Sequence, residues 1–213
     1  MTGPDGRDLT PASEGGPVPR QDAAARVAAI EALLVAKGVV TTDAIDAVVA
    51  AYESDIGPLR GARVVARAWR DPAFRARLLA DGTKAVAELG ITGLRGEHLV
   101  VVENTPEVHN VVVCTLCSCY PWSVLGLPPA WYKSSEYRAR MVIEPRAVLA
   151  EFGLELGDDV EVVVWDSNAE TRYMVLPERP ARTEGLGEDE LAALVTRDCL
   201  VGVAIPAPPA ASR

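Results

Sequence analysis

The hydrophobic positions of residues 22–92 recur with the period of an α-helix. Val27, Ile30 and Leu33 fall on one face of a first helix, and Thr42 caps a second one. Further short helices are expected in the runs ARVVARAW, DPAFRARLLADG and TKAVAELG. The pattern therefore predicts a helical N-terminal arm over residues 22–92.

After residue 93 the pattern changes to short runs of β-branched residues separated by turns. The runs that predict strands are HLVVVEN, VHNVVVC, VEVVVW and RYMVLP. Helical stretches are expected at residues 129–152 and 188–196. Because a block of helices precedes a mixed region, the order predicts an α+β fold rather than a regular parallel sheet. Residues 93–207 are expected to form a mixed layered α/β domain that carries the chemistry.

Composition and charge narrow the range of functions. The Gly- and Pro-rich residues 1–21 and the last residues, 208–213, are expected to be flexible tails. Thirty acidic and 21 basic residues give a net charge of -9, which disfavours binding to nucleic acid and to anionic membranes. No secretory signal and no apolar run of about 20 residues is present, so a cytoplasmic protein is expected.

Three of the four cysteines lie within six residues, at the point where a predicted strand ends. These are Cys114, Cys117 and Cys119, and Pro121 soon afterwards prevents the strand from continuing. A tight loop of this kind can direct three thiols at one centre. Clustered cysteines in a reducing compartment indicate metal or redox chemistry. The sequence therefore predicts a metal loop at the end of a strand.

The expected set of metal ligands is not that of structural zinc. Three thiolates do not complete a four-ligand zinc site, and Cys199 and His109 are more typical of packed residues than of ligands. Backbone amide nitrogens between Cys117 and Cys119 could instead complete a square plane with two sulfurs, with Cys114 as an axial ligand. A sixth position would stay open, as a catalytic metal requires. The spacing alone leaves a redox C-x-x-C pair and inert thiols as alternatives.

The stretch VCTLCSCYPW closely resembles the alpha subunit of nitrile hydratase, and so do the segments LGLPPAWYKSSEYRARMV, TRYMVLPERP and TRDCLVGVAIP. The resemblance covers about residues 24–207. It implies that Cys114, Cys117 and Cys119, with the amides of Ser118 and Cys119, hold a low-spin trivalent metal. It also implies oxidation of Cys117 to sulfinic acid and of Cys119 to sulfenic acid.

The same resemblance implies an activity and a partner. Members of this family are lyases that hydrate nitriles to amides, and the catalytic residues implied here are Cys119, Cys117 and Ser118. The alpha subunit works with a beta subunit, as a heterodimer or an α2β2 heterotetramer, and arginines of the beta subunit bond the oxidised sulfurs. Thr115 favours cobalt, as Co(III), over iron. Trp122 is expected either to line the substrate pocket or to be an ordinary interface aromatic.

Two other functions are compatible with the loop. The metal-bearing subunit of thiocyanate hydrolase shares the cysteine run but tends to carry Arg where this chain has Trp122. A neutral aromatic suits an uncharged nitrile better than anionic thiocyanate. A non-catalytic metal or redox sensor would instead have unmodified thiols and work as a monomer. Nitrile hydration remains the favoured interpretation because the resemblance extends far beyond the loop.

Several aromatic and charged side chains outside the loop are expected to have structural roles. Trp131, Tyr132 and Tyr137 are more typical of a core or interface than of catalysis. Asp166 and Arg172 bracket a turn between two predicted strands, where we expect either a salt bridge between them or support of the metal site.

Overall fold

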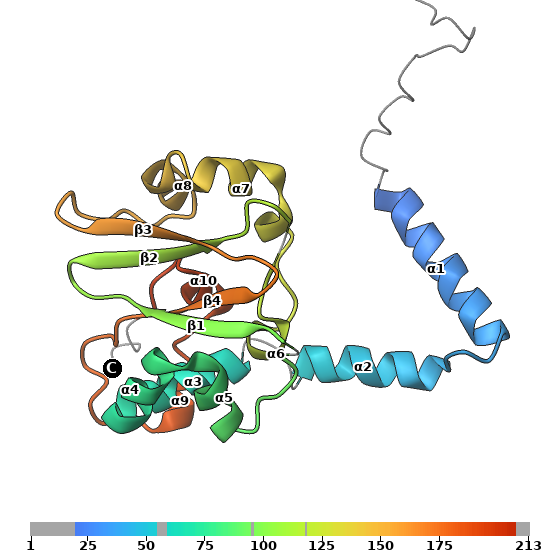
Figure 1. Cartoon of the computed structure of the whole chain (residues 1–213), viewed down its shortest axis with the longest axis horizontal. Coiled ribbons are helices and arrows are strands. Elements are labelled where there is room, and N and C mark those ends of the chain that lie inside the picture. The colour runs from blue at the N-terminus through green and yellow to red at the C-terminus, as the bar shows by residue number, and fades with distance from the viewer. Residues whose placement is uncertain (1–19, 55–58, 95, 118, 208–213) are drawn as a thin grey trace, which may run out of the picture. The chain divides into compact units, whose positions relative to one another are not determined.

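The computed structural model describes residues 20–54, 59–94, 96–117 and 119–207 (Figure 1). Most of the predicted N-terminal tail and all of the C-terminal one lie outside these residues. By their internal contacts the residues form two compact units, residues 1–49 and residues 50–213. The predicted domain boundary near residue 92 stays a prediction.

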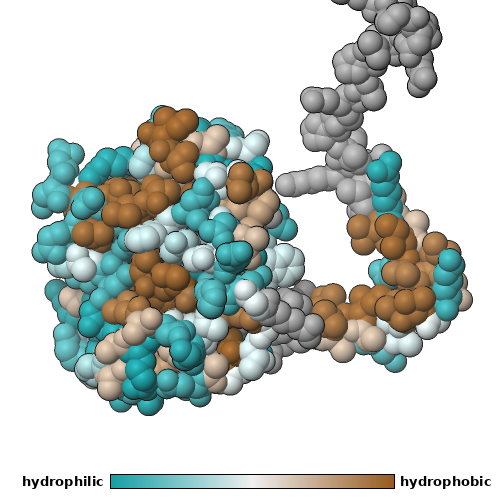
Figure 2. Space-filling model, viewed as in Figure 1, coloured by the Kyte–Doolittle hydropathy of each residue, from teal (hydrophilic) through white to brown (hydrophobic). Residues whose placement is uncertain are grey.

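The first unit contains helix α1 (Arg20–Ala36) and most of helix α2 (Thr42–Ser54). α1 ends at Ala36, and the turn that follows contains Gly38, whose φ of +66° is the left-handed conformation that glycine adopts most readily. The cap of α2 is Thr41, one residue before the expected Thr42, because its hydroxyl accepts a hydrogen bond from the Ala44 amide at 3.2 Å. Both helices expose much apolar surface (Figure 2), which includes Val27.

Among the described residues the second unit contains four strands, and each overlaps one of the runs that the sequence predicts. They are β1 (His98–Glu103), β2 (Val108–Val113), β3 (Glu161–Asp166) and β4 (Thr171–Leu176). Strands β3 and β4 each extend one residue beyond their runs. β1 pairs in parallel with β4, and β2 pairs in parallel with β3. Because β4 also contacts β2, the two small sheets lie against each other.

Short helices cover the strands on both sides. They are α3 (Leu59–Arg70), α4 (Pro72–Ala80), α5 (Gly82–Glu88), α6 (Trp122–Leu125), η1 (Trp131–Lys133), α7 (Ser135–Met141), α8 (Pro145–Glu151), α9 (Glu188–Ala192) and α10 (Arg197–Val201). Helices α4 and α5 pack on β1, whereas α8 packs near β3 (Figure 1). The predicted helical stretch 129–152 is thus divided into three, because Ser134 and Pro145 each begin a new helix. The mixture of helices and small parallel sheets confirms the predicted α+β class.

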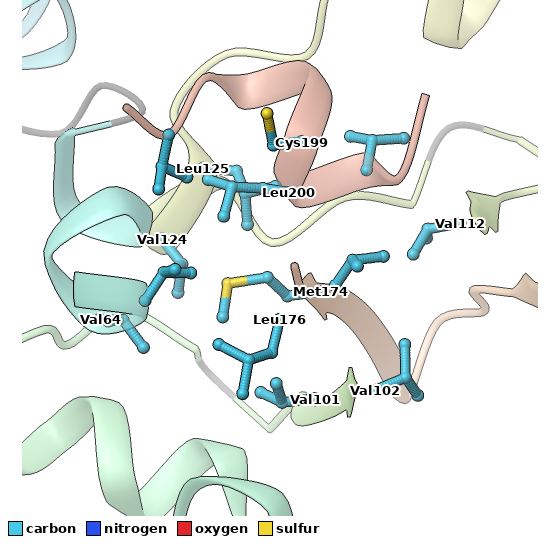
Figure 3. Packing of buried hydrophobic residues seen from close by; sticks show 14 of the residues in the cluster. Val64, Val101, Val102, Val112, Val124, Leu125, Met174, Leu176, Cys199 and Leu200 are labelled. Atoms are coloured by element: carbon cyan, nitrogen blue, oxygen red, sulfur yellow. The ribbon is translucent and has the colours of Figure 1, made fainter. Parts of the chain in front are cut away.

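One hydrophobic core lies between the strands and the helices (Figure 3). Residues of this core that Figure 3 labels are Val64 (α3), Val101 and Val102 (β1), Val112 (β2), Val124 and Leu125 (α6), Met174 and Leu176 (β4), and Cys199 and Leu200 (α10). Within the part of the chain that the structure describes, none of the helices combines the length and apolar character needed to cross a bilayer.

Candidate metal centre at the end of strand β2

The cysteine loop begins where the buried strand β2 ends. Val111, Val112 and Val113 are all almost fully buried, and Cys114 follows them directly with no exposed surface. Val113 lies opposite Asp166 of β3, and its carbonyl accepts a further hydrogen bond from the Ser167 amide at 2.7 Å. The first cysteine is therefore fixed by the sheet, whereas the loop that follows turns out of it.

The three cysteines of the loop come together as the sequence predicts. The Sγ atoms of Cys114 and Cys117 lie 3.5 Å apart, and those of Cys117 and Cys119 lie 3.0 Å apart. All three sulfurs lie within 4.8 Å of one another. Cys114 is buried, Cys119 is half-buried and Cys117 is exposed, so the cluster is open to solvent on one side.

The spacing of the sulfurs fits three ligands of one metal ion. With metal–sulfur bonds of about 2.3 Å, a 90° angle at the metal places two sulfurs about 3.3 Å apart, and a tetrahedral angle about 3.8 Å apart. The separation of 3.0 Å between Cys117 and Cys119 is nearer to the first value, whereas the 3.5 Å between Cys114 and Cys117 lies between the two. A disulfide would need about 2.05 Å, so neither pair is bonded. The cluster therefore has the spacing of three donors around one cation.

The first half of the loop is held by β3. The Asp166 carboxylate accepts a hydrogen bond from the Thr115 amide at 2.9 Å and a second from the Thr115 hydroxyl. Because a carboxylate that accepts two bonds fixes its donors in orientation, Thr115 is held in one conformation beside Cys114. The role of Thr115 visible here is thus to anchor the backbone of the loop.

Side chains of the segment 131–138 hold the carbonyl groups of the loop and of the strand before it. The Tyr132 hydroxyl donates to the Cys119 carbonyl at 2.9 Å. The Tyr137 hydroxyl donates to the carbonyl of Val112 at 2.8 Å. Burial raises the pKa of both tyrosines, so each hydroxyl keeps its proton and stays a donor throughout the working pH range.

The thiol of Cys119 is held protonated in the metal-free chain. Burial raises its pKa to about 12, and the hydrogen bonds with Cys117 and Cys114 act in the same direction. The positive charge of Arg172 acts the other way and lowers the pKa. Crowded thiols repel one another as thiolates, and the positive charge of a bound cation offsets that repulsion and so favours their deprotonation. The cluster is therefore arranged for a cation and not for free thiolates.

The family model for the nitrile hydratase alpha chain matches residues 21–204 of this sequence. The chain belongs to the nitrile hydratase alpha-chain family. It is 59% identical over 196 residues to a low-molecular weight cobalt-containing nitrile hydratase subunit alpha of Rhodococcus rhodochrous, which covers 91% of this chain and 95% of that relative. The family that the cysteine run suggests is thereby confirmed.

Two other relatives define the range of this similarity. A solved structure of an Fe-type nitrile hydratase double mutant from Comamonas testosteroni Ni1 superimposes with a TM-score of 0.85 at 44% identity, and the match covers 92% of this chain and 98% of that one. The gamma subunit of thiocyanate hydrolase from Thiobacillus thioparus is 47% identical over 168 residues, which are 74% of this chain and 69% of that protein. The nitrile hydratase alpha-chain fold thus extends to a second activity.

Several expected site residues of this nitrile hydratase alpha chain can now be placed. Ser118 lies outside the described residues, so its role stays a prediction. Trp122 begins α6 and is 42% exposed, with the Lys133 ammonium 5.8 Å from its ring centre. Cys199 is buried in α10, beside the Thr196 hydroxyl at 3.2 Å, and takes no part in the cluster.

His109 is likewise a structural residue. Its Nε2 lies 2.7 Å from the Gly202 carbonyl and its Nδ1 lies 3.2 Å from the Asn104 amide nitrogen, so both ring nitrogens have partners. Burial lowers its pKa and keeps the ring neutral. It joins β2 to the end of α10 and is not a metal ligand.

The sequence left two roles open for Asp166 and Arg172, a salt bridge between them or support of the metal site. They do not form a salt bridge with each other, because Asp166 bonds Thr115 of the loop and Arg172 bonds Glu97 at 2.8 Å. Arg138 is half-buried and donates a hydrogen bond to the Thr115 carbonyl at 3.2 Å.

The loop-holding roles of Tyr132 and Tyr137 were also missed. Their near-helical spacing indicates a buried face, and a hydroxyl on such a face usually finds a partner. That pattern identifies them as buried donors, but it does not say which carbonyl each one bonds.

We expect Tyr132→Phe to weaken the loop specifically. The change removes a buried donor and leaves the Cys119 carbonyl without that bond, which costs about 1–3 kcal/mol. Thermal unfolding and metal content of the purified enzyme measure the effect. Tyr120→Phe is the matched control, because the buried Tyr120 hydroxyl has no hydrogen-bond partner among the described residues and its loss costs less than about 0.5 kcal/mol. Equal effects of the two variants would contradict the holding role of Tyr132.

Proposed function

We propose that this chain is the metal-bearing alpha subunit of a cobalt nitrile hydratase, which converts nitriles and water to amides together with a beta subunit. The observation that carries the proposal is the cluster of three sulfurs within 4.8 Å of one another in a chain 59% identical to a cobalt-containing alpha subunit. Cobalt is favoured over iron by that relative's name and by Thr115, since the Fe-type structure is more distant at 44% identity.

The ligands are proposed to be the thiolates of Cys114, Cys117 and Cys119, with the amide nitrogens of Ser118 and Cys119. When bound, the metal supplies a Lewis acid that polarises the nitrile or a water molecule. Cys117 is proposed to be a sulfinate and Cys119 a sulfenate, since a bound metal would deprotonate the thiols and sulfur oxidation selects accessible thiolates. The Cys119 sulfenate acts on water or on the nitrile carbon, as base or as nucleophile.

The rest of the chain positions this chemistry. Tyr132 and Asp166 fix the two ends of the loop, so that the sulfurs keep their close spacing. Trp122, three residues after Cys119, is proposed to form an apolar wall for the substrate. Water then adds across the carbon–nitrogen triple bond, with its oxygen on carbon and both protons finally on nitrogen.

A beta subunit is proposed to complete the site, in a heterodimer or an α2β2 heterotetramer. In the chain by itself Leu116 is 84% exposed and Trp122 is 42% exposed, and both flank the cysteine cluster. Apolar side chains of this size at a reactive centre are typical of a pocket that a second chain covers. Arginines of that chain are proposed to bond the oxidised sulfurs, and a cytoplasmic location stays a prediction.

The first test is elemental analysis and peptide mass of this chain co-expressed with a beta subunit. Near-stoichiometric cobalt and three added oxygens on the tryptic peptide of residues 96–133 are expected, together with hydration of acrylonitrile. Zinc with unmodified cysteines would contradict the proposal and leave a structural or sensor loop. Hydrolysis of thiocyanate in preference to acrylonitrile would assign the chain to the second activity, against the neutral Trp122.

A further inference from the structure

The turn from Cys114 to Cys117 is closed by a hydrogen bond to sulfur. The Cys117 amide donates to the Cys114 Sγ at 3.4 Å, and the Sγ atoms of the two cysteines lie 3.5 Å apart. Thr115 and Leu116 form the middle of this turn, and Leu116 is 84% exposed. Because sulfur is a weak acceptor, a bond of this kind fixes a turn poorly without support from outside.

That support comes from two side chains that hold the backbone of Thr115. The amide and the hydroxyl of Thr115 donate to the Asp166 carboxylate, with the amide at 2.9 Å. The Thr115 carbonyl accepts a hydrogen bond from Nη1 of Arg138 at 3.2 Å. The peptide groups before and after Thr115 are thus held by side chains of opposite charge, one from β3 and one from α7. Hydrogen bonds to charged groups are the stronger kind, so these contacts fix the middle of the turn.

Helix α7 itself orients the guanidinium of the half-buried Arg138. The Nε of Arg138 donates to the Ser134 carbonyl at 3.4 Å, four residues earlier along the chain. Ser134 is the N-terminal cap of α7, and its hydroxyl accepts a bond from the Tyr137 amide at 3.1 Å. Side chains of a helix lean toward its N-terminus, so this orientation is an ordinary one. Nε and Nη1 point to different sides of a guanidinium, so Arg138 can bond Ser134 and Thr115 together.

We propose that Arg138 is a positioning residue for the metal. Together with Asp166 it holds the turn from Cys114 to Cys117 in the conformation that takes up cobalt, and so raises the affinity of the loop for the incoming ion. The proposal rests on the function proposed above, which supplies the identity of the metal. Without Arg138 the turn samples other conformations, and the free energy of ordering it then opposes metal binding. Outer groups that orient metal ligands typically change metal affinity about 10- to 100-fold.

The charge of Arg138 also suits a loaded loop. In the proposed ligand set, three thiolates and two amide nitrogens without their protons carry more negative charge than a trivalent cation neutralises. A guanidinium bonded to the carbonyl next to Cys114 therefore favours the loop with its metal over the neutral thiols of the metal-free loop.

The test is Arg138→Gln in the chain co-expressed with its beta subunit, over a series of cobalt concentrations in the growth medium. Glutamine is neutral and shorter than arginine, so it removes the bond to the Thr115 carbonyl. The cobalt concentration that half-loads the purified complex, measured by elemental analysis, is expected to rise about tenfold. Excess cobalt is expected to restore full loading, because the turn can still form once the metal holds it. Hydration of acrylonitrile is expected to follow the cobalt content.

Arg140→Gln is the matched control. Arg140 lies two residues further along α7, and its guanidinium bonds Glu144 and Glu151 instead of the loop. The substitution therefore removes ion pairs from the same short helix and leaves the contact with Thr115 in place. Because exposed ion pairs contribute little, the cobalt concentration for half-loading is expected to stay within about twofold of the wild type.

The outcomes distinguish the two proposals. If the wild-type complex contains zinc or no metal, the proposed function fails and this inference fails with it. If the wild type takes up cobalt and Arg138→Gln loads at the same concentration, only the role of Arg138 is overturned. The same conclusion follows if excess cobalt does not restore Arg138→Gln, which would indicate a misfolded loop, or if Arg140→Gln shows an equal rise. Loss of the beta subunit from purified Arg138→Gln would assign Arg138 to the subunit interface and would also overturn the proposal.

Discussion

Replacing Cys119 by serine is expected to lower nitrile hydration by about 10³-fold or more, which corresponds to about 4 kcal/mol of transition-state stabilisation. The hydroxyl of serine does not ionise as a thiol does, so the ligand set loses one sulfur. Serine also has no sulfur that can carry the oxygen proposed to act on the substrate. Both losses act on the same step, and the kcat for acrylonitrile by the co-expressed complex measures their sum.

Cys199→Ala is the matched control for this substitution. Cys199 is as buried as Cys114, but it lies in α10 and outside the cluster. It is expected to cost stability through lost packing while cobalt content and kcat stay within about threefold of the wild type. Retention of more than a tenth of the activity by Cys119→Ser would contradict the assignment of Cys119 as the reacting cysteine.

Replacing Gly202 by alanine is expected to destabilise the fold by about 4 kcal/mol. Gly202 ends α10 with φ of +90°, and an added Cβ would lie 2.0 Å from the Asn110 carbonyl oxygen of β2. Strain in the left-handed region costs about 1–3 kcal/mol and overpacking costs a similar amount. Because α10 must then move from β2, the bond from His109 to the Gly202 carbonyl is lost as well.

Thermal unfolding of the assembled enzyme tests this expectation. Gly153→Ala is the control, since Gly153 has φ of +84° but nothing lies within 4 Å of its added Cβ. That variant carries only the backbone strain and is expected to cost about 1 kcal/mol. Metal content should fall in Gly202→Ala and not in Gly153→Ala, because Asn110 lies in the strand that leads to Cys114. Equal destabilisation by both variants would show that the contact with Asn110 does not matter.

The sequence by itself determines the elements of this protein and its reactive centre. Runs such as VHNVVVC predict strands because β-branched residues favour extended backbone, and the helical period of Val27, Ile30 and Leu33 predicts α1. Cys114, Cys117 and Cys119 are so close along the chain that a loop of any tight conformation brings their sulfurs together. Local sequence is therefore enough to predict the helices and strands and the cluster of cysteines.

Only the tertiary structure decides which distant groups hold this loop. Tyr132 and Asp166 lie 13 and 51 residues from the loop positions they bond, and the sequence does not fix such pairings. The expected salt bridge between Asp166 and Arg172 fails for the same reason. Asp166 lies in β3 and Arg172 in β4, and these strands belong to different sheets, so the two side chains have different partners, Thr115 for Asp166 and Glu97 for Arg172.

The sequence thus determines which atoms can react, and the packing of the strands determines how they are held. A cysteine run carries its chemistry in residues that are neighbours along the chain. Its geometry depends instead on contacts such as the approach of Gly202 to Asn110 and the bond from the Thr115 amide to the Asp166 carboxylate. These contacts exist only after the chain has folded, because each joins segments that are far apart in the sequence.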